Sequence, residues 1–277
     1  MNFFKSIFKP KFKIETIKTQ DNCAISYSPT RGGLITSIII KGKEILYLDE
    51  STFLNIHQSV RGGIPILFPN AGALVDDKNN KFKDLKQHGF ARNSNKWISE
   101  KGVDNFIETL ISNDETKEVY PYDFKLRVSA QIEKDNSITI EQGVENTNSA
   151  SGMPIAMGLH PYFKVKDIDK KNILFNWKGG EIVKENFPIW SEGGTVYIDN
   201  PKVNDPEAKL EIFIPGLGNL SLDVSASYQK IWIWSLPGKD FICIEPMMRG
   251  LNGLNDDPEI IKPNSKFSAS INLNLNF

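Results

Sequence analysis

Several features that mark particular protein classes are scarce in this sequence. Cysteine occurs only twice among 277 residues, as Cys23 and Cys243, which lie far apart and form no CxxC spacing. We therefore expect no disulfide scaffold. Each thiol is interpreted as free and buried, in a protein of a reducing compartment.

Strong net charge and long apolar runs are also missing. The formal net charge is −1 and the sequence pI is about 6.3, so no long-range field would attract nucleic acid or an anionic bilayer. No stretch approaches the roughly 18 consecutive apolar residues of a membrane span, and the basic, aromatic N-terminus lacks the apolar region and cleavage site of a secretory signal. We expect a cytoplasmic protein with no membrane span and no nucleic-acid partner.

Apolar residues with the period of a helix are the third feature that is missing. No segment of about 12 residues combines an apolar stripe of helical period with caps at both ends. Instead, apolar and polar residues alternate over residues 125–132, a KDNS turn follows, and the alternation resumes at Ile138 and Ile140. This pattern predicts a β-hairpin. The same alternation from Phe267 to Phe277 predicts a C-terminal strand.

Short runs of this kind recur along the chain, separated by clusters of Gly, Pro, Asn and Asp. Many short strands with almost no helix are typical of an all-β fold, either a β-sandwich or a related packed-sheet fold. No flexible linker or charge block marks an internal boundary. We predict one domain over residues 21–277, preceded by an N-terminal arm over residues 1–20.

Two basic segments interrupt the strand pattern and are candidates for ligand binding, because loops on a rigid scaffold often carry function. Arg61 opens the Gly- and Pro-rich segment VRGGIPILFPNAG, and His88 and Arg92 lie in KQHGFARN. Guanidinium groups present paired donors that suit a polar or anionic ligand. Each segment taken alone is equally typical of a structural loop or a basic surface turn.

Two further segments hold candidates for proton transfer. His160 lies in MGLHPYFKV beside aromatic residues, where an imidazole can exchange a proton near neutral pH. Glu245 ends the apolar run FICI before Pro246, and burial there would raise the carboxyl pKa. A histidine satisfied by a backbone carbonyl and a structural ion pair are the ordinary alternatives.

Taken in order, four motifs resemble the aldose 1-epimerase (galactose mutarotase-like) superfamily, and within it the hexose-phosphate mutarotase branch. The motifs are RGGIPILFPNAG, QHGFARN, VENTNSASGMPIAMGLHPYF and CIEPM, and the resemblance spans the chain from about residue 25 to the end. It implies a single large antiparallel β-sandwich of many strands, with a sugar cleft on its concave face.

The resemblance also implies roles for five residues. The catalytic acid falls on His160, the catalytic base on Glu245 and the histidine that contacts the sugar on His88. The arginines of the phosphate site fall on Arg61 and Arg92. In the expected reaction the base removes the O1 proton while the acid protonates the ring oxygen O5, and reclosure yields the other anomer.

This reaction requires neither a metal nor an organic cofactor, and its partner is a small sugar or sugar phosphate. We expect burial to raise the pKa of Glu245 and the nearby carboxylate to keep His160 protonated. Aromatic faces suit the apolar patches of a pyranose, and Phe68, Tyr162 and Trp234 are candidates to contact it.

One segment departs from the family pattern. Gly194 and Thr195 occupy the place of an Asp-Arg pair whose aspartate holds sugar hydroxyls, so either Asp199 or Glu192 substitutes for it or the contact is missing. Arg249, downstream of the CIEPM motif, is interpreted either as an addition to the site or as a surface cation.

Two alternatives stay open at this point. His88, His160 and Glu245 could form a metal site, since these residue types bind Zn or Fe, although no HExxH or HxH spacing is present. The chain could also be a sugar-binding or regulatory module without turnover. Either a monomer or a homodimer is compatible with the sequence.

Overall fold

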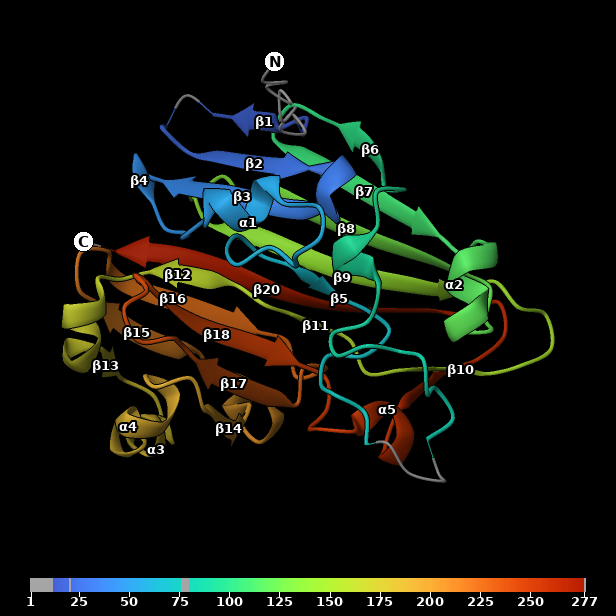
Figure 1. The fold of residues 1–277 in the computed structure, drawn as a ribbon. Coiled ribbons are helices and arrows are strands. Elements are labelled where there is room, and N and C mark those ends of the chain that lie inside the picture. Colours follow the sequence, from blue (N-terminus) through green and yellow to red (C-terminus); the bar gives the residue numbers. More distant parts are fainter. Residues whose placement is uncertain (1–11, 20, 76–79, 277) are drawn as a thin grey trace, which may run out of the picture.

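A computed structural model describes residues 12–19, 21–75 and 80–276 (Figure 1). Every pair of named strands in this part of the chain is antiparallel. The helices are short, and no helix of the described residues has the length and apolar character needed to cross a bilayer. The predicted all-β fold is confirmed.

The largest sheet has eight strands. In spatial order they are β13 (Leu174–Phe175), β15 (Leu210–Ile214), β16 (Gly218–Val224), β20 (Lys266–Asn276), β9 (Ile138–Asn146), β8 (Phe124–Ile132), β7 (Asn105–Ile111) and β6 (Ile98–Lys101).

A six-stranded sheet carries most of the residues discussed below. Its order is β14 (Thr195–Asp199), β17 (Lys230–Trp234), β18 (Phe241–Met247), β11 (Gly158–Leu159) and β5 (Ile66–Leu67), with β12 (Tyr162–Lys164) paired to β18 beside β11.

Two smaller sheets and short helices complete the fold. The strands are β1 (Glu15–Lys18), β2 (Ala24–Ser28), β3 (Leu34–Ile40) and β4 (Lys43–Glu44) in one sheet, and β10 (Met153–Ile155) and β19 (Glu259–Ile261) in the other. The helices are α1 (Glu50–Leu54), α2 (Asp114–Val119), α3 (Gly180–Glu185), α4 (Phe187–Trp190) and α5 (Gly253–Asp256), with 3₁₀ turns η1 (Pro29–Arg31), η2 (Ala91–Asn93), η3 (Asp167–Asn172) and η4 (Pro201–Val203).

The predicted hairpin and C-terminal strand are both present. Strands β8 and β9 pair along their whole length, and Asn136 makes the turn in the left-handed conformation, with φ of 66°. The carboxylate of Asp135 accepts hydrogen bonds from the backbone N–H and hydroxyl of Ser137, which fixes the turn. Strand β20 lies between β16 and β9 and buries alternate side chains, as its sequence pattern predicts.

Part of the predicted N-terminal arm belongs to a sheet. Residues 15–18 form β1 and pair with β2, and Ile17 is 1% exposed. The boundary at residue 20 was therefore placed too late, because a four-residue strand at a sheet edge is too short to give a clear alternating pattern. Residues 1–11 and 20 of the predicted arm lie outside the described residues.

One hydrophobic cluster extends from Ile17 to Leu275 and takes inward side chains from both large sheets. Gln142 on β9 crosses this core: its amide donates to the Leu67 carbonyl and accepts from the Tyr228 hydroxyl, and all three side chains are buried. Since buried polar groups are costly unless paired, this bridge fixes the relative position of the two sheets.

Glu108 is the exception to this pairing rule. It lies on β7 among inward-facing residues, is 0% exposed, and neither carboxyl oxygen has a hydrogen-bond partner among the described residues. Burial, with a smaller contribution from the negative charge of Glu15, raises the pKa of Glu108 to about 8. The side chain is therefore mostly a neutral acid at pH 7.

This pKa predicts how stability depends on pH. Between the ordinary carboxyl pKa of 4.5 and about 8, the unfolded chain has lost a proton that the folded chain keeps, so the free energy of unfolding falls as pH rises through this window. Glu108→Gln should remove this decrease, which totals on the order of 5 kcal/mol. Urea unfolding from pH 5 to 9 measures it. Glu100→Gln on the exposed face of β6 is the matched control, and the same slope in parent and Glu108→Gln would contradict the assignment.

Candidate active site

A cavity of about 650 Å³ opens over one face of the six-stranded sheet. Its lining residues come from four β-strands of that sheet (β12, β14, β17 and β18), from the turn between β11 and β12, and from loops and short helical segments around them. They are Thr52, Gln58, Ser59, Val60, Arg61, Gln87, His88, Arg92, His160, Tyr162, Gly193, Thr195, Tyr197, Trp232, Trp234, Glu245 and Leu251.

Strand register explains how one row of the cavity floor is assembled. Tyr197 on β14 lies opposite Trp232 on β17, and Trp232 lies opposite Glu245 on β18. Directly opposed residues of antiparallel strands project from the same face of a sheet. The row therefore carries Glu245 at one end and two aromatic rings beside it, with Tyr197 and Trp232 in edge-to-face contact at 5.0 Å between ring centroids.

A second row runs parallel to the first, two residues along each strand. Thr195 lies opposite Trp234, Trp234 opposite Cys243, and Cys243 opposite Tyr162 of β12. Cys243 and Glu245 therefore share one face of β18, as the two-residue period of a strand requires.

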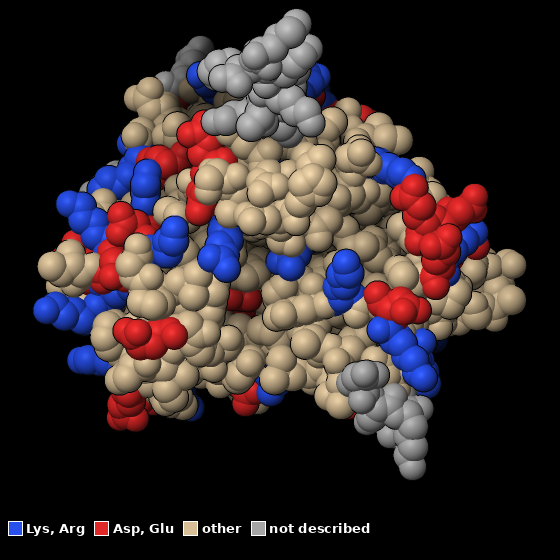
Figure 2. All heavy atoms as spheres, viewed as in Figure 1, with Lys and Arg blue, Asp and Glu red and all other residues tan. Residues whose placement is uncertain are grey.

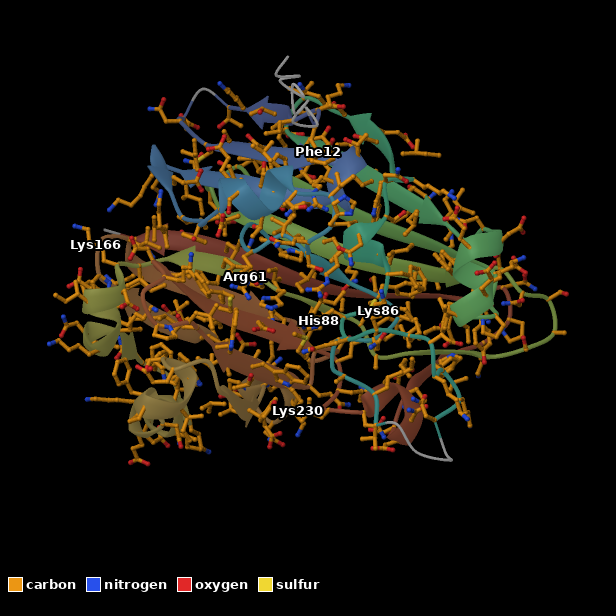
Figure 3. The ribbon with its side chains drawn as sticks, in the orientation of Figure 1. Phe12, Arg61, Lys86, His88, Lys166 and Lys230 are labelled. Carbon is orange, nitrogen blue, oxygen red and sulfur yellow. The ribbon has the colours of Figure 1, made fainter. Side chains whose placement is uncertain are left out.

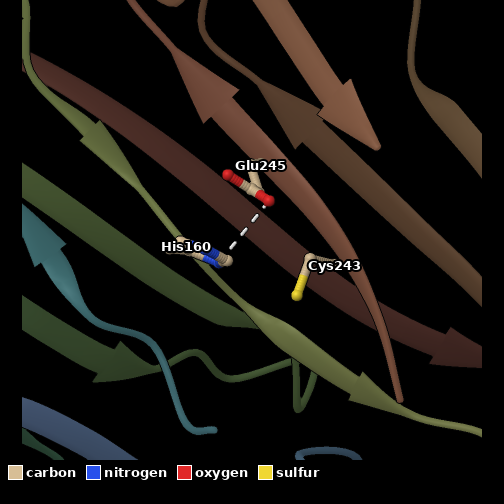
Figure 4. A group of neighbouring side chains, drawn as sticks. All are labelled: His160, Cys243 and Glu245. Atoms are coloured by element: carbon tan, nitrogen blue, oxygen red, sulfur yellow. Dashed lines mark ion pairs between the residues drawn. The ribbon is translucent and has the colours of Figure 1, made fainter. Parts of the chain in front are cut away.

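His160 lies in the turn between β11 and β12, above these rows. Its Nδ1 lies 3.6 Å from Oε1 of Glu245, and Figure 4 shows the two side chains facing one another. The imidazole stacks on Tyr162 at 4.7 Å with an interplanar angle of 9°. His160 is 5% exposed and Glu245 2%, so both predicted proton-transfer groups are brought together in a largely dehydrated site.

Burial shifts the pKa values of both groups in this pair. It raises the pKa of Glu245 well above its usual range, against the opposing effect of Arg92, and it lowers the pKa of His160, with further lowering from the basic side chains of His88 and Arg92. The expected rise for Glu245 agrees with the structure. The expectation that the nearby carboxylate raises the pKa of His160 is wrong, because desolvation and two basic neighbours lower it.

His88 reaches the cavity from the segment before η2. Its Nδ1 donates to the Ala71 carbonyl, which can only accept, so Nε2 is left as the acceptor. Burial and the charge of Arg92 lower the pKa of His88 to about 3, so the ring is neutral. Gly89, with φ of 67°, lets this backbone pass Phe68, since a Cβ there would lie 2.0 Å from the Phe68 carbonyl oxygen.

Two arginines give the cavity its charge. Arg61 is exposed and Arg92 is half-buried, and Nε of Arg92 has no hydrogen-bond partner among the described residues. Figure 2 shows a row of Lys and Arg side chains across the middle of this face, and Figure 3 labels Arg61, Lys86 and His88 in the same part of the view. Glu245 is the only acidic residue in the described lining, and burial raises its pKa, so the basic side chains of Arg61 and Arg92 dominate the charge of the cavity.

The cavity wall that carries Arg61 is held by a buried arginine that the sequence analysis did not select. Arg31 is 5% exposed, and its guanidinium donates to the carbonyl oxygens of Thr52, Phe53, Asn55 and Gln58. Thr52 and Gln58 line the cavity, so Arg31 shapes the rim without touching it.

The three predicted aromatic contacts divide between cavity and core. Tyr162 and Trp234 line the cavity, whereas Phe68 is 0% exposed and packs on Phe90, Tyr120 and Phe124. The prediction that Phe68 contacts the sugar is wrong. Its ring belongs to the main hydrophobic cluster, where a sugar in the cavity cannot reach it.

Neither proposed substitute for the missing aspartate lines the cavity. Asp199 pairs with Lys230 two positions along β14 and β17 from the first row, and Glu192 is exposed outside the cavity lining. Arg249 is also absent from the lining. It is 8% exposed and pairs with Asp257 and Glu259, so it is a buried structural cation and not an addition to the site.

Sequence reasoning missed Tyr197 and Trp232. The segment KIWIW contained the signal for Trp232, because a two-residue period places it on the same face as the selected Trp234. Tyr197 has no comparable signal, since it enters the site only through the register of β14 with β17.

The three side chains of the metal alternative do not form a cluster. His88 is tied to Ala71, and the group of potential ligands that converges among the described residues is His160, Cys243 and Glu245, with ligand atoms within 4.8 Å of one another. The metal-free acid–base chemistry described above requires only His160 and Glu245.

Comparison with known proteins agrees with the motifs. A family model described as aldose 1-epimerase matches residues 15–273. Protein LacX of Lactococcus lactis subsp. lactis is 25% identical over 289 residues, covering 89% of this chain and 94% of that protein. A protein of Escherichia coli (strain K12) named "Putative glucose-6-phosphate 1-epimerase" is 32% identical over 138 residues, 47% of this chain and 42% of that protein. This chain thus matches less than half the length of that relative, and 44% of a protein of the same name from Cenchrus ciliaris.

Solved structures share the whole fold. The Slr1438 protein from Synechocystis sp. PCC 6803 has a TM-score of 0.83 and 29% sequence identity, and 98% of each chain is covered. A galactose mutarotase related enzyme from Lactobacillus acidophilus has a TM-score of 0.74 at 19% identity, covering 96% of this chain and 98% of that one. At 19% identity, the likeness to the Lactobacillus acidophilus protein establishes a galactose mutarotase-like fold and nothing about activity.

Arg31 provides a test of how the rim is held. Arg31→Met should leave buried carbonyl groups unpaired and lower the free energy of unfolding by about 3 kcal/mol. Arg31→Lys should fall between parent and Arg31→Met, since an ammonium reaches fewer of these carbonyls. Urea unfolding measures stability, and hydrogen exchange of residues 52–61 measures local opening. Arg127→Met on the exposed face of β8 is the control. Unchanged hydrogen exchange of residues 52–61 in Arg31→Met would contradict the role of Arg31 in holding the rim.

Proposed function

The chain belongs to the aldose 1-epimerase family, and from this premise we propose that it interconverts the α and β anomers of a hexose or hexose 6-phosphate. The observation that carries the proposal is the buried His160–Glu245 pair, which faces a cavity of sugar size. An isomerase of this type needs one acid and one base within reach of O1 and O5, the two oxygens bonded to the anomeric carbon.

In the proposed reaction Glu245 takes the O1 proton and His160 protonates O5, which opens the ring. Rotation about C1–C2 exposes the other carbonyl face, and the same groups act in reverse to close it. Positioned proton transfer of this kind contributes typically 10²–10⁴-fold. His88, with Nε2 free to accept, would hold a sugar hydroxyl.

The resting pair shares one proton, and the reaction must relocate it. Burial favours the neutral form, in which Glu245 holds the proton and His160 is a free imidazole. A hydrogen bond donated by the sugar O1–H would stabilise the carboxylate. The proton then passes across the 3.6 Å contact to His160, which sets base and acid in their working forms without changing the net charge.

The two guanidinium groups support a phosphorylated substrate. Arg61 and Arg92 line the same cavity, and both act on the Tyr162 hydroxyl, where each opposes the rise in its pKa that burial causes. Phosphate takes paired hydrogen bonds from guanidinium groups. The name of the E. coli relative, which matches over about half of this chain, agrees with glucose 6-phosphate as a substrate.

Glu245→Gln tests the base. The amide cannot accept the O1 proton, so anomer exchange on glucose 6-phosphate, glucose and galactose should fall by roughly 10²–10⁴-fold. Saturation-transfer NMR measures it. Glu108→Gln is the matched control, since it changes another buried acid far from the cavity and should retain exchange. A folded Glu245→Gln variant as active as the parent would contradict the assignment, and no exchange by the parent on any aldose would favour a binding module.

Arg61→Ala tests the phosphate site. Loss of one charge-assisted contact should raise KM for glucose 6-phosphate about 10- to 100-fold, while KM for free glucose should change less than twofold. The rim position of Arg61, away from the floor, makes this separation possible. Arg127→Ala is the surface control. An equal rise in KM for glucose 6-phosphate and for glucose would contradict the assignment of Arg61 to the phosphate group.

A further inference from the structure

Cys243 takes no part in the proposed exchange, yet it lies beside both groups that transfer protons. The ligand atoms of His160, Cys243 and Glu245 are all within 4.8 Å of one another. The three side chains are 5%, 0% and 2% exposed, respectively. Cys243 is also a free thiol.

The fold produces this convergence in two ways. Cys243 and Glu245 are two residues apart on β18 and project from the same face, toward the turn that carries His160 (Figure 4). Nδ1 of His160 has no hydrogen-bond partner among the described residues. A nitrogen lone pair or N–H buried in this way is normally satisfied, so the position suits a ligand.

We propose that His160, Cys243 and Glu245 form a binding site for a thiophilic divalent cation of the Zn²⁺ class, and that its occupation inhibits the protein. Thiolate, imidazole and carboxylate are the ligands that Zn²⁺ takes from proteins. His160 and Glu245 line the cavity and Cys243 lies behind them, so a fourth coordination position would face the sugar cavity.

The geometry requires only a small adjustment. With bond lengths of about 2.0–2.3 Å, ligand atoms around a tetrahedral Zn²⁺ lie about 3.4–3.7 Å apart. His160 and Glu245 already meet this spacing at 3.6 Å, and the widest separation in the group is at most 4.8 Å. Closing it by about 1 Å is within the reach of the Cys243 and Glu245 side chains.

Protons leave when the cation enters. The Cys243 thiol and the Glu245 carboxyl each release one proton to solvent, and the neutral imidazole of His160 binds through Nδ1. Two anionic ligands then balance the two charges of the cation. This balance offsets the repulsion from Arg61 and Arg92, which the cation must pass in the cavity.

The inhibitory effect rests on the proposed function. A cation held by Glu245 and His160 removes the lone pair that accepts the O1 proton and the nitrogen that donates to O5. Exchange would therefore be lost outright, and a chelator would restore it. The site itself depends only on the three side chains and is testable without activity.

Co²⁺ titration of the reduced, full-length protein tests the site. A thiolate ligand gives Co²⁺ an intense near-ultraviolet charge-transfer band, and we expect one equivalent to saturate it. Cys243→Ser should abolish the band, and Cys243→Ala serves if the serine variant does not fold. Cys23→Ser is the matched control, because Cys23 is also buried but lies far from the group. No thiolate band in the parent, or its loss in Cys23→Ser, would overturn the proposal.

Zn²⁺ inhibition of anomer exchange tests the consequence. The parent should lose exchange at a concentration at least tenfold lower than Cys243→Ser, and EDTA should reverse the loss. Equal sensitivity of the two proteins would overturn the inhibitory role. If the parent exchanges no aldose at all, the proposed function fails, and the Co²⁺ spectra still decide the metal site.

Discussion

The contact on which the site depends is that between a carboxyl group and an imidazole, both removed from water. An unpaired charge at either position would be costly in this environment, so the pair is favoured with a single shared proton and no net charge. Glu245 reaches this state because an apolar stretch of β18 precedes it, and His160 because Tyr162 covers one face of its ring. The same dehydration that makes ions unfavourable at rest strengthens every hydrogen bond that a sugar would make there.

Strands and loops contribute to this site in different ways. The six-stranded sheet supplies a floor of fixed spacing, because strand register sets Tyr197 beside Trp232 and Trp232 beside Glu245. The rim consists of loops, which lack the backbone hydrogen bonds that join paired strands. Single residues position these loops instead. Arg31 binds the carbonyl groups of one loop, and Gly89 lets the other approach Phe68 closely. A rigid floor under a clamped rim allows the loops to vary without displacing the proton-transfer pair.

The sequence predicted those features that depend on neighbouring residues. The β8–β9 hairpin, the β20 strand and the burial of Glu245 all follow from two-residue alternation and its interruption. It did not predict features set by distant contacts. Phe68 was taken for a site residue because the direction of a side chain after a two-residue strand is not encoded locally. The direction of the His160 pKa shift was misjudged because its burial, and the approach of His88 and Arg92, arise only in the folded chain. The clamp by Arg31 was missed for the same reason.

A neutral pair also explains how a chain with a net charge of −1 can present a cationic cavity. If Glu245 were ionised at rest, it would cancel much of the field of Arg92 inside the cavity. Because burial raises the pKa of the carboxyl group, it favours the protonated form, in which the charges of Arg61 and Arg92 are not offset for a ligand that enters. A local field of this kind decays within about 10 Å at ordinary ionic strength. It therefore acts on a ligand inside the cavity and is screened over the described surface farther away.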